Sequence, residues 1–70
     1  MSWNYRVIKR LVDNVEFFAI HEVYYDEYEI PEFVTESPAC PQGETLEELK
    51  KNSSLYVMAL EKPVLIYEDF

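Results

Sequence analysis

The 70-residue chain is poor in several residue types that common functional sites require. Its single glycine, Gly43, rules out a glycine-rich loop that could cradle a phosphate group. Its single cysteine, Cys40, rules out an intramolecular disulfide and a cysteine-based metal site within one chain. The sequence therefore predicts neither a nucleotide-binding loop nor a disulfide-stapled scaffold, and a lone cysteine suits a reducing compartment.

Positive charge is also scarce. Six Lys and Arg face 14 Asp and Glu, so the formal net charge is -8. Nucleic acids and anionic lipid surfaces are bound largely through Lys and Arg, so we expect neither as a partner. A basic protein partner is favoured, because complementary charge speeds encounter and suppresses wrong pairings. The alternative is that the charge only keeps a small protein soluble.

Long hydrophobic runs are absent as well. No apolar stretch approaches the roughly 20 residues needed to cross a bilayer. The first residues lack the apolar segment of a secretory signal, so we expect a cytoplasmic protein. A hydrophobic content of 49%, with 16% aromatic residues, predicts one folded domain over residues 1–70. A domain of this size buries only about 60% of its surface on folding, so a partner would add stability.

Two alternating segments dominate the first half of the chain. Residues 3–12 and 16–25 are rich in β-formers with period-two alternation, which predicts two strands. Asp13 and Asn14 lie between them and tolerate left-handed backbone angles, so a two-residue turn should join the strands into a hairpin.

The second half predicts a short strand, a helix and a final short strand. An acidic connection at residues 26–32 contains Pro31, which restricts any strand through it to a sheet edge. A third strand is expected at residues 33–36, a helix at 46–61 and a short strand at 64–67. The predicted fold is α+β, in the order β-β-β-α-β: a three-stranded antiparallel sheet with one helix packed on one face and a short C-terminal strand.

The start of the helix carries the strongest local signal. Thr45 and Glu48 have the spacing of a capping box, in which each side chain satisfies a backbone N–H of the first turn. Pro63 ends the helix. Six residues form one stripe at helical spacing, which we expect to be the packing face: Leu46, Leu49, Ser53, Tyr56, Val57 and Leu60.

Few residues suggest catalysis or metal binding. His21, the only histidine, lacks neighbours suited to a general base or a metal site, so a structural or surface role is favoured. The acids Asp26, Glu27, Glu29 and Glu32 lack the spacing and central glycine of a calcium loop and read as a solvated segment. Cys40 reads as a loop thiol despite lying near the helix start. We therefore expect no enzyme and no cofactor.

Aromatic residues are numerous, and they suggest protein contacts. They could stack on RNA bases, but such binders also need cations, so packing in a core or a protein interface is favoured. If the sheet leaves one aromatic face open, the candidate partner-binding residues are Phe18, Ile20 and Tyr24. The partner would be a small basic protein, or a second copy of this chain in a homodimer.

The segment from residue 37 to 49 also resembles a known family. Its Ser-Pro-Ala-Cys-Pro-Gln-Gly-Glu-Thr-Leu-Glu-Glu-Leu sequence is similar to the point in HicB-type antitoxins where a third strand enters a proline-cysteine loop and a helix. The resemblance implies a partial ribonuclease H-like fold that binds and blocks a small basic mRNA-cleaving toxin and oligomerises. It concerns that family's N-terminal domain and not its C-terminal DNA-binding segment, so repressor activity is not expected. Ribonuclease H-like topology does not imply nuclease activity.

Overall fold

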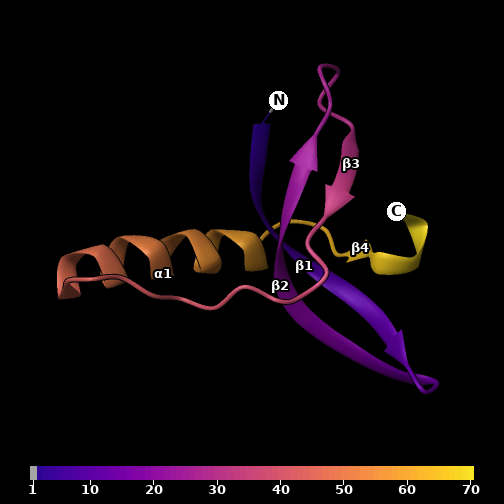
Figure 1. Cartoon of the computed structure of the whole chain (residues 1–70), viewed down its shortest axis with the longest axis horizontal. Helices are drawn as coiled ribbons and strands as arrows, with labels where there is room; N and C mark the ends of the chain where they lie inside the picture. The colour runs from indigo at the N-terminus through magenta and orange to yellow at the C-terminus, as the bar shows by residue number, and fades with distance from the viewer. Residues whose placement is uncertain (1) are drawn as a thin grey trace.

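The computed structural model describes residues 2–70 and has an α+β fold, as the sequence predicts (Figure 1). In chain order the elements are β1 (Ser2–Val12), β2 (Val15–Tyr25), β3 (Pro31–Val34), α1 (Leu46–Leu60), β4 (Leu65–Ile66) and the 3-10 turn η1 (Tyr67–Asp69).

The four strands form one twisted sheet in the order β3-β2-β1-β4. The long β1–β2 hairpin is antiparallel and turns at Asp13 and Asn14, whose φ angles of 52° and 66° confirm the predicted left-handed turn. The β3 strand pairs antiparallel with β2 and starts at Pro31, on the outer edge of the sheet.

The C-terminal strand makes the sheet mixed. Leu65 and Ile66 pair with Ile8 and Lys9 in parallel. The expectation of an antiparallel three-stranded sheet plus a short strand is therefore correct only in outline. The chain returns from α1 so that β4 runs in the same direction as β1, and no local sequence signal sets that direction.

One face of the sheet, the C-terminal face, holds the main hydrophobic core. Ile8, Val23 and Tyr25 are buried there and are covered by partly buried side chains from β3 and the C-terminal segment. Those covering residues are Val34, Leu65 and Tyr67. The C-terminal segment thus packs on this face through Leu65 and Tyr67.

Several polar groups on the C-terminal face are paired, although the Arg6 Nε is buried without a hydrogen-bond partner among residues 2–70. Tyr25 donates its hydroxyl to Asn4 Oδ1 at 2.7 Å and accepts a hydrogen bond from Arg6 at 3.0 Å. The Arg10 guanidinium carbon lies 4.0 Å from the Tyr67 ring centroid, a cation–π contact. These contacts join β1 and β2 to the C-terminal turn.

The helix begins as predicted. The Glu48 N–H donates to Thr45 Oγ1 at 3.1 Å, which is the first half of the capping box. The Glu48 carboxylate accepts a hydrogen bond from the Glu44 N–H at 2.9 Å, one residue earlier than the reciprocal bond of a standard box. The helix ends at Leu60, with Glu61 as its C-cap, just before Pro63.

The face of α1 that packs on the sheet overlaps the predicted stripe only at Tyr56, which is buried, and at Ser53, which is half-buried. Tyr56 and Ala59 are the buried helical residues, and Asn52 is half-buried, whereas Leu46, Val57 and Leu60 are exposed. The helix is rotated because Tyr56 stacks on Tyr5 of β1, with ring centroids 4.3 Å apart, and Asn52 donates to the Tyr5 hydroxyl at 3.2 Å. A buried aromatic stack with a hydrogen bond outweighs the greater apolarity of the leucine stripe.

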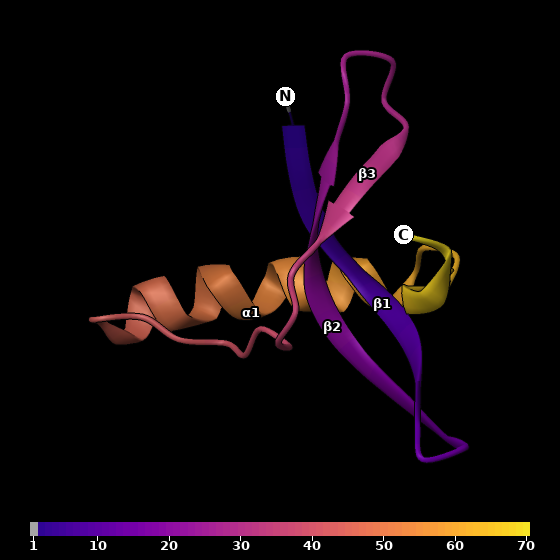
Figure 2. The same ribbon diagram turned by 45° about the vertical axis from the view of Figure 1, so that its right-hand side comes forward.

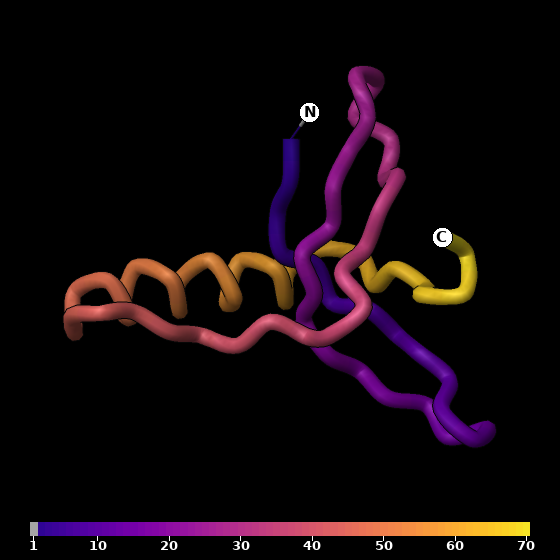
Figure 3. Tube along the Cα trace, in the orientation of Figure 1, coloured from indigo at the N-terminus to yellow at the C-terminus, as the bar shows by residue number. Residues whose placement is uncertain are grey.

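The segment between β3 and α1 runs back along the helix (Figure 3). Its Ala39 N–H donates to Ile20 O at 2.9 Å, and its Gln42 N–H donates to Asn52 Oδ1 at 3.0 Å. The segment therefore connects the sheet edge to the helix without regular secondary structure of its own.

The molecule is open for its size. It exposes 5289 Å², whereas a compact monomer of 8.4 kDa is expected to expose about 4,600 Å². Its radius of gyration is 12.8 Å, against about 11 Å expected for 70 compact residues. The helix, the β1–β2 hairpin tip and the β2–β3 loop project in different directions from a small centre (Figure 1).

Candidate interaction surface

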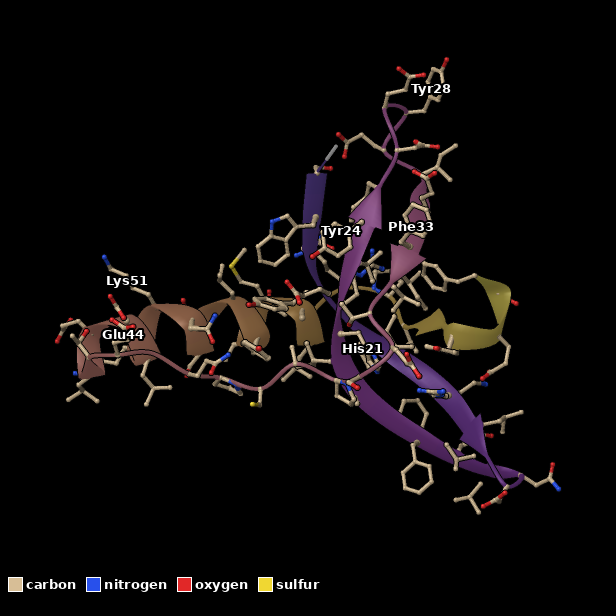
Figure 4. All side chains as sticks on the ribbon, viewed as in Figure 1. His21, Tyr24, Tyr28, Phe33, Glu44 and Lys51 are labelled. Atoms are coloured by element: carbon tan, nitrogen blue, oxygen red, sulfur yellow. The ribbon has the colours of Figure 1, made fainter. Side chains whose placement is uncertain are left out.

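The opposite side of the sheet, the helix face, carries a row of aromatic side chains across three strands. Strand register places Phe33 of β3 opposite Tyr24 of β2, and Tyr24 opposite Trp3 of β1. The Trp3 and Tyr24 ring centroids are 6.3 Å apart. We call these three residues the aromatic row; Figure 4 shows Tyr24 and Phe33 at adjacent positions on their strands.

The aromatic row continues into a groove beside the helix. Trp3 meets Tyr5 edge to face at a centroid separation of 5.2 Å, and Tyr5 stacks on Tyr56. The groove has a volume of about 340 Å³ and is lined by Trp3, Asn4, Tyr5, Leu55, Met58 and Lys62. Its lining combines flat aromatic rings with flexible Leu and Met side chains, a composition that adapts to an apolar side chain of a partner.

The acidic β2–β3 loop borders the row. Asp26 Oδ1 accepts hydrogen bonds from the N–H groups of Tyr28 and Ile30, at 2.8 and 3.0 Å. Glu29 has a φ of 61° and supplies the tight bend. The carboxylates of Glu27, Glu29 and Glu32 are exposed, so the loop that joins Tyr24 to Phe33 carries negative charge.

Burial strongly affects one ionisable group at this surface. Removal of the Tyr56 hydroxyl from water raises its pKa from 10.0 to about 12. A hydrogen bond with Tyr5 and the negative charges that Tyr5, Cys40 and Glu22 can carry act in the same direction. Tyr56 is therefore a neutral packing residue, and it fixes the helix beside the groove.

The three predicted partner-binding residues all lie on the helix face, but they do not form one open patch. Tyr24 belongs to the aromatic row. Ile20 pairs with Val7 and is half-buried. Phe18 is 59% exposed and lies near the start of β2, close to the hairpin tip. The helix also packs on this face, through Tyr5. Phe18 and Tyr24 are thus separated into two exposed regions.

Sequence reasoning did not single out Trp3 and Phe33 as site residues. Trp3 shares the alternation of Tyr5 and Val7, so its face was predictable. The position of Phe33 depends on the register of β3 against β2, which includes an irregularity between Tyr24 and Tyr25. That register is set by tertiary packing.

The other candidate residues have structural settings. His21 is 2% exposed, and its Nδ1 lies 2.9 Å from Thr35 O. Cys40 is an exposed free thiol in the segment before the helix.

Within residues 2–70, no cluster of three His, Cys, Asp or Glu side chains could hold a metal ion. None of the helices in this range has the length and apolar character needed to cross a membrane.

In comparisons with known proteins, no family model, no curated protein and no solved structure matches this chain.

Proposed function

We propose that the protein is a binding module for a basic protein partner, and that its role is like that of the N-terminal domain of HicB-type antitoxins. The observation that carries this proposal is the aromatic row of Trp3, Tyr24 and Phe33 on the helix face, bordered by the acidic β2–β3 loop. Apolar rings inside a charged rim are the usual arrangement of a protein-binding hot spot.

The two parts of the surface have separate roles. The rings and the adjoining groove supply apolar area that a partner side chain can fill, which mainly slows dissociation. The loop carboxylates attract Lys and Arg of the partner and accelerate encounter. Binding, rather than chemistry, is the activity proposed, and the consequence for the partner would be steric occlusion of its own functional surface.

Affinity purification from the native host, with the mass of the eluted complex measured by light scattering, tests the proposal. A small basic protein in stoichiometric amount is the expected companion. If that companion cleaves mRNA, added purified chain should inhibit cleavage, which tests the antitoxin-like role directly. A companion that is acidic, or none at all, would contradict the proposed function.

The binding surface is tested with matched variants. Phe33→Ala should weaken binding of the companion at least about tenfold, since exposed aromatic anchors carry a disproportionate share of interface energy. Val57→Ala is the control, because Val57 and Phe33 are each 58% exposed but Val57 lies on the helix outside the row. Equal losses for the two variants, with unchanged circular dichroism, would place the contact elsewhere.

A further inference from the structure

We propose that two copies of this chain form a homodimer by pairing their β2 strands, antiparallel, along the open edge of the hairpin arm. The hairpin arm is defined as residues 10–18, the tip of the β1–β2 hairpin. Its tip projects away from the helix (Figure 2). The surface is separate from the aromatic row, so this inference does not depend on the proposed function.

The backbone of the arm has one free edge. The β1–β2 register closes at the Val12–Val15 pair, so alternate β2 residues direct their backbone groups away from β1. Farther along β2 these outward groups have partners: Ile20 O accepts from Ala39, and Glu22 O accepts from Thr35. Within residues 2–70, no backbone hydrogen bond from another segment reaches Glu16 or Phe18. These two residues present the unpaired groups that recruit another strand.

The opposite edge of the arm is occupied. The Leu11 N–H donates to the Glu68 carboxylate at 3.2 Å, and β4 pairs with the neighbouring part of β1. Strand addition to the arm is therefore directed to β2. An identical strand fits that edge because antiparallel pairing about a two-fold axis is self-complementary.

The two-fold axis that fits best passes beside Phe17. Glu16 of each copy then pairs with Phe18 of the other, and the two Phe17 side chains become direct cross-strand neighbours on the C-terminal face. Aromatic cross-strand pairs stabilise antiparallel sheets. Phe17 also lines a groove of about 310 Å³, together with Ile8, Arg10, Val12, Phe18, Ala19, His21 and Pro38. The second copy would cover that mostly apolar groove.

The charge distribution allows like chains to meet at the arm. The whole chain carries a net charge of -8, which opposes self-association on most of the surface. Around the arm, however, Lys9 and Arg10 offset two of the three nearby acids, which are Asp13, Glu16 and Glu68. Lys9 Nζ lies 4.0 Å from the Glu16 carboxylate. The arm is therefore much less negative than the chain as a whole, so repulsion between two arms is weak.

The exposed area also fits a dimer. The chain exposes 5289 Å², about 700 Å² more than a compact monomer of its mass. A standard stable interface buries about 800 Å² per partner. Val12, Val15, Phe17 and Phe18 are all exposed in the single chain, so the arm supplies apolar area for that interface.

Sedimentation velocity on the purified full chain tests the dimer. The expected species has twice the 8.4 kDa mass of the chain. Phe18→Pro removes the outward N–H from each copy but leaves the ladder to β1 intact, and should weaken dimerisation at least about tenfold. Phe18→Ala keeps that N–H and should retain more self-association than Phe18→Pro. A wild-type chain that stays monomeric up to about 1 mM would overturn the proposal.

Hydrogen exchange on the wild-type chain gives a second test that does not rely on a foldable variant. The Glu16 and Phe18 amides should gain protection as the concentration is raised through the dimerisation range. The exchange rate of the Tyr28 amide, in the β2–β3 loop, should not change. A dimer in which Glu16 and Phe18 exchange at the monomer rate would show that a different surface mediates association. Capture of a basic companion tests the proposed function separately.

Discussion

Tyr56 is the side chain that sets the orientation of the helix on the sheet. Its ring stacks on Tyr5 at a centroid separation of 4.3 Å, and the contact turns Leu46, Val57 and Leu60 away from the sheet. Because the hydroxyl is buried, its pKa rises to about 12, so ionisation of this tyrosine opposes folding.

Stability should therefore fall at high pH through Tyr56. The contribution is fully present below the ordinary tyrosine pKa of 10.0 and is lost as pH rises toward the folded-state pKa of about 12, because only the unfolded chain ionises in that interval. Tyr56→Phe should show a shallower decline in the free energy of unfolding between pH 9 and 11, measured by urea denaturation. Tyr28→Phe is the control, since that side chain is 75% exposed. A Tyr56→Phe profile parallel to wild type would contradict the assignment.

Among the elements, the helix start depends on a close backbone approach. A Cβ added to Gly43 would lie 2.5 Å from the Leu49 backbone nitrogen and 2.8 Å from the Glu48 carbonyl carbon. The constraint is steric contact with the first helical turn, because Gly43 does not have a positive φ. The only glycine of the chain is thus placed where the preceding loop folds against the helix it introduces.

Gly43→Ala should destabilise the protein by about 1–3 kcal/mol, as expected for overpacking against backbone that cannot move freely. Gln42→Ala is the matched control, because Gln42 contacts Asn52 through its backbone N–H, which alanine retains. The measurement is chemical denaturation of both variants. A Gly43→Ala variant as stable as Gln42→Ala would mean that the loop shifts at little cost.

At the scale of the whole molecule, charge and shape separate the two proposed interactions. The net charge of -8 should steer a basic companion over a long range, whereas the charges around the arm nearly cancel. The small core of Ile8, Val23 and Tyr25 leaves much apolar surface for both interfaces.

Salt should distinguish these two events. Between about 0.01 and 0.15 M ionic strength the Debye length falls from about 30 to 8 Å. The association rate with a basic companion should then fall about tenfold or more. Dimerisation should change little or strengthen. Stopped-flow fluorescence of Trp3 and sedimentation at the two salt concentrations supply the measurements; a salt-independent association rate would argue against electrostatic steering.

Short-range signals predicted most of the elements. Asp13 and Asn14 favour left-handed angles, Thr45 caps the helix and Pro63 follows its end, and each effect acts within a few residues. The candidate site was less predictable: Tyr24 lies in the aromatic row, while Phe18 lies on the arm and Ile20 is half-buried between them. Alternation assigns a side chain to a face but does not say which part of that face a helix covers.

By itself, the amino-acid sequence determined the α+β class, the hairpin turn, the helix start and the acidic charge, because these depend on local backbone preferences and composition. Only the tertiary structure decided the parallel pairing of β4, the register that brings Phe33 beside Tyr24, and the rotation of α1 onto Tyr56. These three features depend on contacts between residues far apart in the chain. For α1, the stacking of Tyr56 on Tyr5 competes with the burial of leucines, and the outcome is decided only when the strands and the helix pack together.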